Sequence, residues 1–263
     1  MTAEVRFQER GEGSTILCLH GLTSASQAFE HAQDLSDTFR VLAWDAPGFG
    51  KSPDPDGQPT LSWYAERAAE LVRAQCSEPV HVLGVSWGGL VGMRLALDEP
   101  QLVKSLVLAD SMLGYAHDQT GAERVAADCD MLSTSGVAAF AAAHVPRLVS
   151  PNAEPRLIEA LTTMLTSDVR PGGYAAAAAT VVDTDLKPAL RSVIQPTLVL
   201  CGEDDGITGI DMSQRVASAI PNAVFVTMAG AGHLPHQEKP ESFNAWLRSF
   251  LHIVDNVRET AEV

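Results

Sequence analysis

The chain has little positive charge for its length. Its 263 residues include 18 lysines and arginines against 33 aspartates and glutamates, which gives a formal net charge of −15 at pH 7. A field of this sign repels polyanions, so the composition argues against nucleic acid or an anionic membrane surface as a partner. A small anionic substrate is still allowed, because a local arginine can override the mean field within about one Debye length.

Cysteine is also scarce, and its spacing fits neither a metal site nor a redox motif. The four cysteines form no Cys-x-x-Cys motif and no zinc-type spacing, and Cys18 and Cys201 fall within predicted buried strands. We therefore expect reduced thiols in the core, no metal site and no cofactor.

Long apolar runs are missing as well. Residues 1–10 contain no apolar stretch of the kind that a signal peptide needs, and no run approaches the roughly 18 apolar residues of a membrane helix. These absences predict a cytoplasmic protein with no membrane partner, and they leave the assembly state open, a homodimer included. The 46% hydrophobic and 19% charged residues are typical of a globular protein.

The most informative stretch, residues 84–88, reads Gly-Val-Ser-Trp-Gly and fits the pattern Gly-x-Ser-x-Gly. It follows a β-branched run at 80–85 and precedes an apolar run of helix length at 90–97. A strand-to-helix turn this sharp strains its serine and needs neighbours without bulk, which the glycines supply. This context favours a nucleophilic Ser86, above the positive end of the following helix, over an ordinary glycine–serine turn.

Predicted strands and helices alternate along most of the chain, which is typical of an α/β fold with a parallel sheet. Residues 114–183 break this alternation, because they contain alanine clusters and helical segments without strong strand signals. We interpret them as a helical cap over the carboxyl ends of the strands, and residues 1–113 and 184–263 as the core domain. The predicted strands are 5–8, 15–19, 39–44, 80–85, 103–109, 196–201 and 223–228, and the predicted core helices are 25–35, 61–76, 90–97, 212–220 and 240–251.

A serine, an acid and a histidine each stand in a loop that follows a predicted strand. Ser86 is the candidate nucleophile, His233 the base that takes its proton, and Asp205 the acid that holds the imidazole tautomer. Asp110, at the end of the strand at 103–109, is a second candidate for the acid. The order serine, acid, histidine along the chain is the one that α/β hydrolases use.

The loop after the strand at 15–19 lies where an open α/β sheet binds its ligand. We predict that the backbone N–H groups of Leu22 and Trp87 are the two donors that stabilise an oxyanion. His20 is interpreted as a structural histidine that bonds the loop backbone in preference to a catalytic one. Asp45 likewise fits a turn residue that binds nearby amides better than an acid of the site.

Together these motifs resemble the α/β-hydrolase superfamily over essentially the whole chain. The resemblance implies a mostly parallel central sheet of seven or eight strands flanked by helices, with a helical cap insertion. The short N-terminus has room for one strand where the family commonly has two, which favours seven. In the family the acid usually stands three residues after a glycine, which selects Asp205 over Asp204. The matching features are His20-Gly21, Asp45-x-Pro-Gly-x-Gly-x-Ser52, Gly84-x-Ser86-x-Gly88, Gly202-x-x-Asp205 and Gly232-His233.

Within the superfamily the chain looks most like the 3-oxoadipate enol-lactonases. The stretches that carry this likeness are 106–111, 172–176, 183–186, 196–199, 230–235 and 240–245. Two departures stand beside it. The Gly-Val-Ser-Trp-Gly-Gly elbow is more similar to that of some esterases, and residues 115–150 match the lactonase pattern poorly.

The sequence thus predicts a serine hydrolase that cleaves a small carboxylic ester or lactone, with 3-oxoadipate enol-lactone as the best single candidate. The alternatives are a carbon–carbon bond hydrolase of a dienoic or diketone acid, a general carboxylesterase, a cofactor-free oxygenase and a non-catalytic receptor. Trp87 is expected either to flank the pocket or to pack in the core, and His236 either to contact substrate or to face solvent. The candidate substrate contacts are Met112, Arg124, Arg147 and His236.

Overall fold

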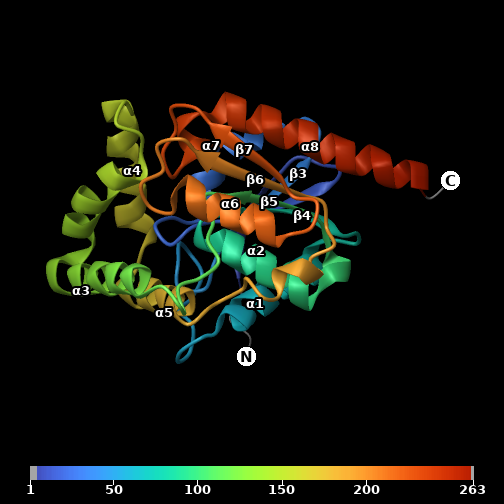
Figure 1. Cartoon of the computed structure of the whole chain (residues 1–263). Coiled ribbons are helices and arrows are strands. Elements are labelled where there is room, and N and C mark those ends of the chain that lie inside the picture. The colour runs from blue at the N-terminus through green and yellow to red at the C-terminus, as the bar shows by residue number, and fades with distance from the viewer. Residues whose placement is uncertain (1–4, 262–263) are drawn as a thin grey trace.

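A seven-stranded sheet forms the centre of the molecule (Figure 1). The computed structural model describes residues 5–261, in which the strands lie in the order β1-β3-β2-β4-β5-β6-β7. β1 is antiparallel to β3, and every other neighbouring pair is parallel. The strands are β1 (Arg6–Arg10), β2 (Thr15–Leu19), β3 (Arg40–Asp45), β4 (Val80–Val85), β5 (Val103–Ala109), β6 (Thr197–Gly202) and β7 (Val224–Met228).

The central strands are buried because their sequences are nearly continuous apolar runs, as a sheet covered on both faces requires. Every residue of β2, β4 and β6 is buried, whereas the edge strands β1 and β7 are largely accessible. The predicted bounds of β2, β4 and β5 match the structure, and the prediction of seven strands is confirmed.

Helices cover both faces of this sheet (Figure 1). α1 (Leu61–Gln75) packs on α2 (Trp87–Asp98), and α2 packs on β2, β4 and β5. α8 (Pro240–Ala261) covers the opposite face. The other elements outside residues 114–183 are α6 (Gly209–Ala219), α7 (Pro235–Glu238) and the 3-10 helices η1 (Ser26–Phe29), η2 (His31–Leu35), η3 (Pro100–Leu102) and η4 (Leu190–Ser192). No helix among residues 5–261 combines the length and apolarity that crossing a membrane requires.

The predicted helix over residues 25–35 is wrong in type, because the chain forms the two short 3-10 helices η1 and η2 there. The Asp45 carboxylate accepts a hydrogen bond from the Ser26 N–H at 2.9 Å and fixes the start of η1. The following backbone bonds span three residues, as from the Ala28 N–H to the Ala25 carbonyl. The contact with β3 therefore determines the conformation of this segment more than its own helix propensity does.

The final helix runs ten residues further than residue 251, the predicted end. Asp255 holds this extension, because it pairs with Lys104 and lies 3.1 Å from the ring of His81 at the amino end of the sheet. Burial acts to raise the pKa of Asp255, but the hydrogen bonds and charges of His81 and Lys104 lower it to about 2. The neighbouring Val254 is buried. These contacts with β4 and β5, which are distant in sequence, stabilise the part of α8 that lies beyond its predicted end.

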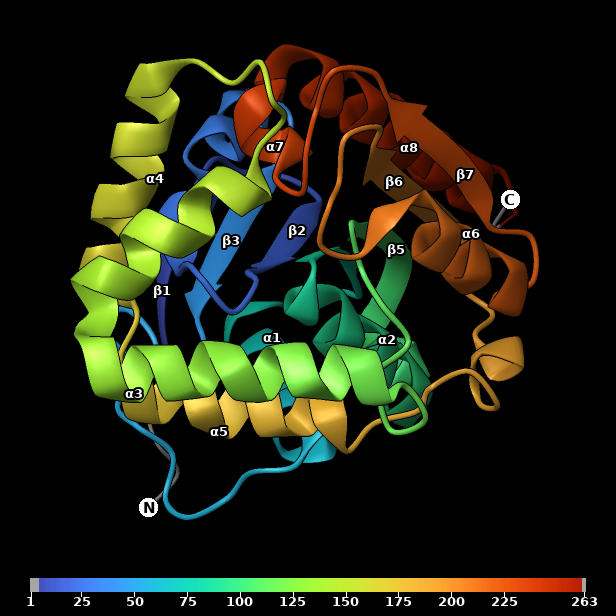
Figure 2. The same ribbon diagram turned by 60° about the vertical axis from the view of Figure 1, so that its left-hand side comes forward.

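Three α-helices lie between β5 and β6: α3 (Gln119–Leu148), α4 (Pro155–Asp168) and α5 (Pro171–Val182). Asp118 caps α3 by accepting the Gly121 N–H at 3.0 Å, and proline starts both α4 and α5. α3 is interrupted at Gly136, where φ is 80°, and its halves run in different directions (Figure 2). α3 packs against both α4 and α5.

Candidate active site

Ser86 lies on a strained turn between β4 and α2. Its φ of 53° and ψ of −118° are unfavourable for a residue with a side chain, at a typical cost of about 1–3 kcal/mol. The adjacent glycines make the turn sterically feasible. A Cβ on Gly84 would lie 2.6 Å from the Gly88 carbonyl oxygen, and one on Gly88 only 2.0 Å from the Leu19 carbonyl oxygen. The close approach of α2 to β2 and β4 is therefore what requires the Gly-x-Ser-x-Gly pattern.

The loops after β4, β6 and β7 bring Ser86, Asp205 and His233 together. His233 Nε2 lies 2.9 Å from Ser86 Oγ, and His233 Nδ1 lies 3.0 Å from Asp205 Oδ1. Because an ionised carboxylate can only accept, Nδ1–H donates to Asp205 and Nε2 accepts the Ser86 hydroxyl proton. The imidazole is thus held in the tautomer that a general base needs.

Further hydrogen bonds fix the Asp205 carboxylate. It accepts the Ile207 N–H at 2.8 Å, the Gly209 N–H at 3.0 Å and the hydroxyl of Thr208. Burial acts to raise the pKa of Asp205, but the charge of His233 and these hydrogen bonds together hold it well below its ordinary value. The acid therefore stays ionised beside the imidazole at neutral pH.

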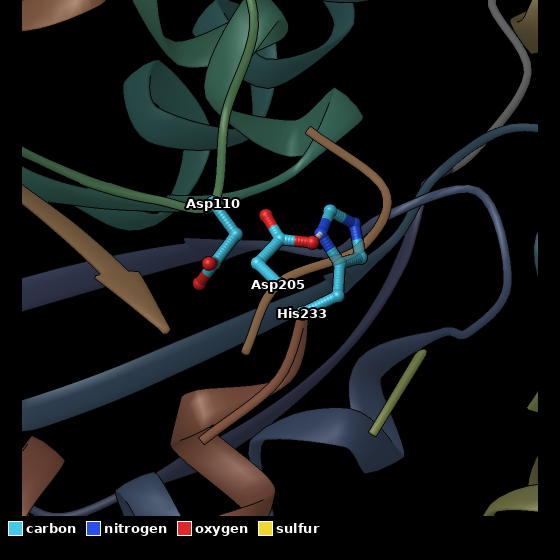
Figure 3. A group of neighbouring side chains, drawn as sticks. All are labelled: Asp110, Asp205 and His233. Atoms are coloured by element: carbon cyan, nitrogen blue, oxygen red, sulfur yellow. Dashed lines mark hydrogen bonds and ion pairs between the residues drawn. The ribbon is translucent and has the colours of Figure 1, made fainter. Parts of the chain in front are cut away.

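Asp110 lies next to this pair but makes a different contact (Figure 3). It is fully buried with φ of 45°, and its Oδ1 accepts the Gly202 N–H at 2.8 Å. Burial, followed by the charge of Asp205, raises the pKa of Asp110 well above its ordinary value. His233 Nδ1 is directed at Asp205, so the geometry separates the two acids that the sequence left as alternatives.

Asp110, Asp205 and His233 are also residue types that bind metals, and their ligand atoms lie within 4.8 Å of one another. Both oxygens of Asp205, Oδ1 of Asp110 and both nitrogens of His233 already take part in hydrogen bonds within the protein. These side chains are therefore arranged as an acid–imidazole pair held by hydrogen bonds within the protein.

The loop after β2 lies directly against Ser86. A Cβ on Gly21 would be 3.3 Å from Ser86 Cβ, so the backbone passes beside the nucleophile. His20 holds this loop: its Nδ1–H donates to the Gly21 carbonyl at 2.7 Å, and its Nε2 accepts the Ala46 N–H at 3.0 Å. Burial lowers the pKa of His20 to about 4, which keeps the ring neutral. The prediction of a structural His20 is confirmed.

The Trp87 side chain does not line the pocket. It is fully buried and stacks at 6.5 Å on Trp44, with Tyr64 edge-on at 4.8 Å. Its Nε1–H donates to the hydroxyl of Thr180 on α5 at 3.0 Å. Of the two sequence-based interpretations of the Trp87 side chain, packing in the core is correct. Only the backbone N–H of Trp87 is a candidate donor to an oxyanion.

A pocket with a cavity volume of about 70 Å³, partly open to solvent, lies above Ser86 and His233. Its lining includes four of the residues that the sequence singled out, Leu22, Met112, Arg124 and Arg147. The helices between β5 and β6 form much of its wall. Sequence reasoning missed several of these residues, although the spacing of 121, 124, 125 and 128 on one helical face was a readable signal. The missed residues include Tyr115, Asp128, His144, Tyr174 and Ile207.

His236 lies outside this pocket, and neither of its predicted settings is correct. The short helix α7 directs the ring inward, where it is 5% exposed and packs at 5.7 Å from Phe29 and 5.9 Å from Phe243. Its Nδ1 has no hydrogen-bond partner in the part of the chain that the structure describes. Burial, followed by the charges of His233 and His31, lowers the pKa of His236 to about 3.

Substituting phenylalanine for His236 is expected to make the fold more resistant to acid. Between pH 6.5 and about 3, His236 binds a proton in the unfolded chain but stays neutral in the fold. The free energy of unfolding therefore falls as the pH falls. At pH 5 this costs the wild type about 2 kcal/mol relative to pH 7. Urea unfolding at both pH values measures it, with H117F at the exposed His117 as control. An H236F variant with the pH dependence of the wild type would contradict the prediction.

Comparison with known proteins gives a consistent picture. The family model described as "Alpha/beta hydrolase family" matches residues 16–246. A pimeloyl-[acyl-carrier protein] methyl ester esterase from Chromobacterium violaceum is 28% identical over 242 residues, which cover 89% of this chain and 92% of that protein. A thermophilic esterase from Thermogutta terrifontis, solved with malate bound, superposes with a TM-score of 0.88 at 29% identity and covers 96% of this chain and 94% of its own. The enol-lactonase from Burkholderia xenovorans LB400 has a TM-score of 0.87 at 23% identity, covers 95% of this chain and 97% of its own, and shares the fold.

Proposed function

Because the chain belongs to the alpha/beta hydrolase family, an enzymatic family, we propose that it is a serine hydrolase that cleaves a carboxylic ester or lactone through an acyl-enzyme on Ser86. The observation that carries this proposal is the chain of hydrogen bonds from Ser86 through His233 to an ionised Asp205, at the floor of a pocket. This is the arrangement that activates a hydroxyl of low intrinsic nucleophilicity.

In the proposed reaction His233 Nε2 takes the hydroxyl proton as Ser86 Oγ attacks the ester carbonyl carbon. The oxyanion that forms is stabilised by the N–H groups of Leu22 and Trp87, at the positive end of α2. When the intermediate collapses, His233 returns the proton to the leaving alcohol oxygen and an acyl-Ser86 remains. Water, deprotonated by the same nitrogen, then releases the acid and restores the serine.

We further propose that residues 114–183 act as a cap that supplies substrate specificity, while residues 1–113 and 184–263 supply the chemistry. The support is the division of the pocket: Ser86 and His233 come from the sheet loops, whereas Arg124, Asp128 and Tyr174 come from α3 and α5. The four cysteines are free, which supports the proposal of a cytoplasmic location.

The names of the relatives refer to an ester and to a lactone, so the preference of this protein between the two classes of substrate is tested by measuring rates on one of each. We expect the wild type to hydrolyse 3-oxoadipate enol-lactone with a kcat/KM about 10³-fold above that for a short-chain p-nitrophenyl ester, or some 4 kcal/mol of transition-state discrimination. The expectation follows from the enol-lactonase-like stretches of the sequence and from the arginines in the pocket wall. Initial rates on both substrates, with S86A as background, measure it.

The other outcomes of this comparison each identify a different activity. A preference for the p-nitrophenyl ester would make the protein a general carboxylesterase. Slow turnover of both substrates would favour carbon–carbon bond hydrolysis of a dienoic or diketone acid, whose carboxylate the pocket arginines would also suit. Equal rates for wild type and S86A would overturn the acyl-enzyme on Ser86.

A further inference from the structure

The upper wall of the pocket carries a group of charged side chains that the proposed chemistry does not use. Arg124 and Asp128 lie on the first half of α3, and His144 and Arg147 lie on the second half, beyond the interruption at Gly136. The turn at Gly136 therefore brings charged residues from distant parts of one helix to the same pocket. Specificity in a pocket is typically set by a few such polar groups.

Asp128 provides a partner for two of the three basic side chains. Its Oδ1 lies 3.4 Å from Arg147 Nη1 and 3.7 Å from His144 Nδ1. The His144 ring is stacked on Phe140 at 4.7 Å and is 6% exposed, so it is fixed in the wall. The positive charge of Arg147 is thus largely balanced within the protein itself.

Arg124 is different, because no carboxylate among the described side chains of residues 5–257 lies within ion-pair distance of it. Its Nη1–H donates a long hydrogen bond of 3.4 Å to the carbonyl of Ile207, which follows the acid Asp205 in sequence. The other arginines on α3 and α4, and Arg170 just before α5, each have a carboxylate partner: Arg147 with Asp128, Arg156 with Glu154 and Arg170 with Asp54. Arg124 therefore presents a guanidinium without a carboxylate partner to this pocket, in a chain with a net charge of −15.

We propose that Arg124 is the counter-ion of a carboxylate carried by the substrate, so that the enzyme acts on esters or lactones of carboxylate-bearing acids. A guanidinium binds a carboxylate through two parallel hydrogen bonds, which fixes orientation as well as charge. Asp128 on the same wall repels a dianion more strongly than a monoanion, which favours a carboxylate over a phosphate. This inference rests on the proposed function, because it describes the substrate of the same Ser86 site.

The test uses pairs of methyl esters that differ only in the distal group. Monomethyl adipate carries a carboxylate where methyl hexanoate carries a methyl group, and the monomethyl esters of succinate and suberate vary the spacing. We expect the wild type to favour at least one monomethyl ester over its neutral partner by about 10- to 100-fold in kcat/KM. In R124Q the ratio should fall to about 1, mainly through KM. In R124K it should take an intermediate value, because the lysine ammonium is a single point charge and cannot form the two parallel hydrogen bonds of a guanidinium.

Arg156 offers a matched control. It is 86% exposed on α4 beside Glu154, and it does not line the pocket, so R156Q should keep the wild-type ratio. A ratio near 1 in the wild type for every chain length, or the same ratio in R124Q as in wild type, would overturn the role of Arg124. Circular dichroism of each variant checks that the fold is retained.

Failure of the proposed function would give a different result from failure of this inference. Binding of adipate to S86A, measured by calorimetry, depends on Arg124 and needs no turnover. If the wild type hydrolyses neither ester of any pair but R124Q weakens adipate binding by tenfold or more in the S86A background, the serine chemistry is wrong and the carboxylate site stands. If esters are hydrolysed and adipate binding does not depend on Arg124, the chemistry stands and the carboxylate site is wrong.

Discussion

Replacing Ser86 with alanine is expected to lower kcat by about 10⁴- to 10⁶-fold on every ester or lactone substrate. The variant lacks the oxygen that attacks the carbonyl, and His233 Nε2 loses its 2.9 Å partner. Alanine keeps the Cβ that already fits the turn at φ of 53°, so the fold should be retained. Steady-state rates measure the loss, and circular dichroism with thermal melting checks the fold.

A matched control for S86A is Ser213→Ala. Ser213 is buried as well, but it lies on α6 and not in the pocket, so its loss should leave kcat within about threefold of the wild type. A phosphonate ester inhibitor should add its mass to the wild type and not to S86A. Hydrolysis by S86A at the wild-type rate would remove Ser86 from the mechanism.

Replacing Asp205 with asparagine is expected to lower kcat by about 10⁴-fold. The amide can present an N–H where the carboxylate presented an oxygen, so the imidazole turns to the tautomer whose Nε2 carries the proton and can no longer accept one from Ser86. The ionised Asp205 also stabilises the imidazolium that forms during attack, and a neutral amide does not. Comparison of kcat for D205N and wild type on the same ester measures the effect.

Asp110→Asn separates this role from that of the neighbouring acid. The pKa of Asp110 is already raised well above its ordinary value, and its Oδ1 is bonded to the Gly202 N–H, so an amide of the same shape should cost less than about tenfold in kcat. A loss in D110N larger than that in D205N would identify Asp110 as the acid that orients His233.

The parts of the fold that could be predicted from the sequence are those dictated by local physics. Buried parallel strands need continuous apolar runs, so β2, β4 and β5 could be located from composition alone. The strained turn at Ser86 requires glycines at fixed offsets, and its position between a strand and a helix could be read directly. The order of Ser86, Asp205 and His233 followed from the loops after β4, β6 and β7.

The parts that could not be predicted depend on contacts between distant residues. Asp128 and Arg147 are nineteen positions apart on α3, and they meet because the helix is interrupted at Gly136. Whether Arg147 has a carboxylate partner is therefore decided by the geometry of that interruption. His236 was misplaced for a related reason, since only the packing of α7 against Phe29 and Phe243 buries it.

The stretch that contains α3, α4 and α5 leaves the sheet and returns to it at nearly the same point. The Leu186 N–H donates to the Leu113 carbonyl at 2.9 Å, and the Ala116 N–H donates to the Thr184 carbonyl at 3.0 Å. A segment whose ends are hydrogen-bonded to each other can be exchanged without altering the path of the chain on either side. Recombination at this junction would give the pocket a new set of walls, while Ser86, Asp205 and His233 would keep their places in the loops after β4, β6 and β7.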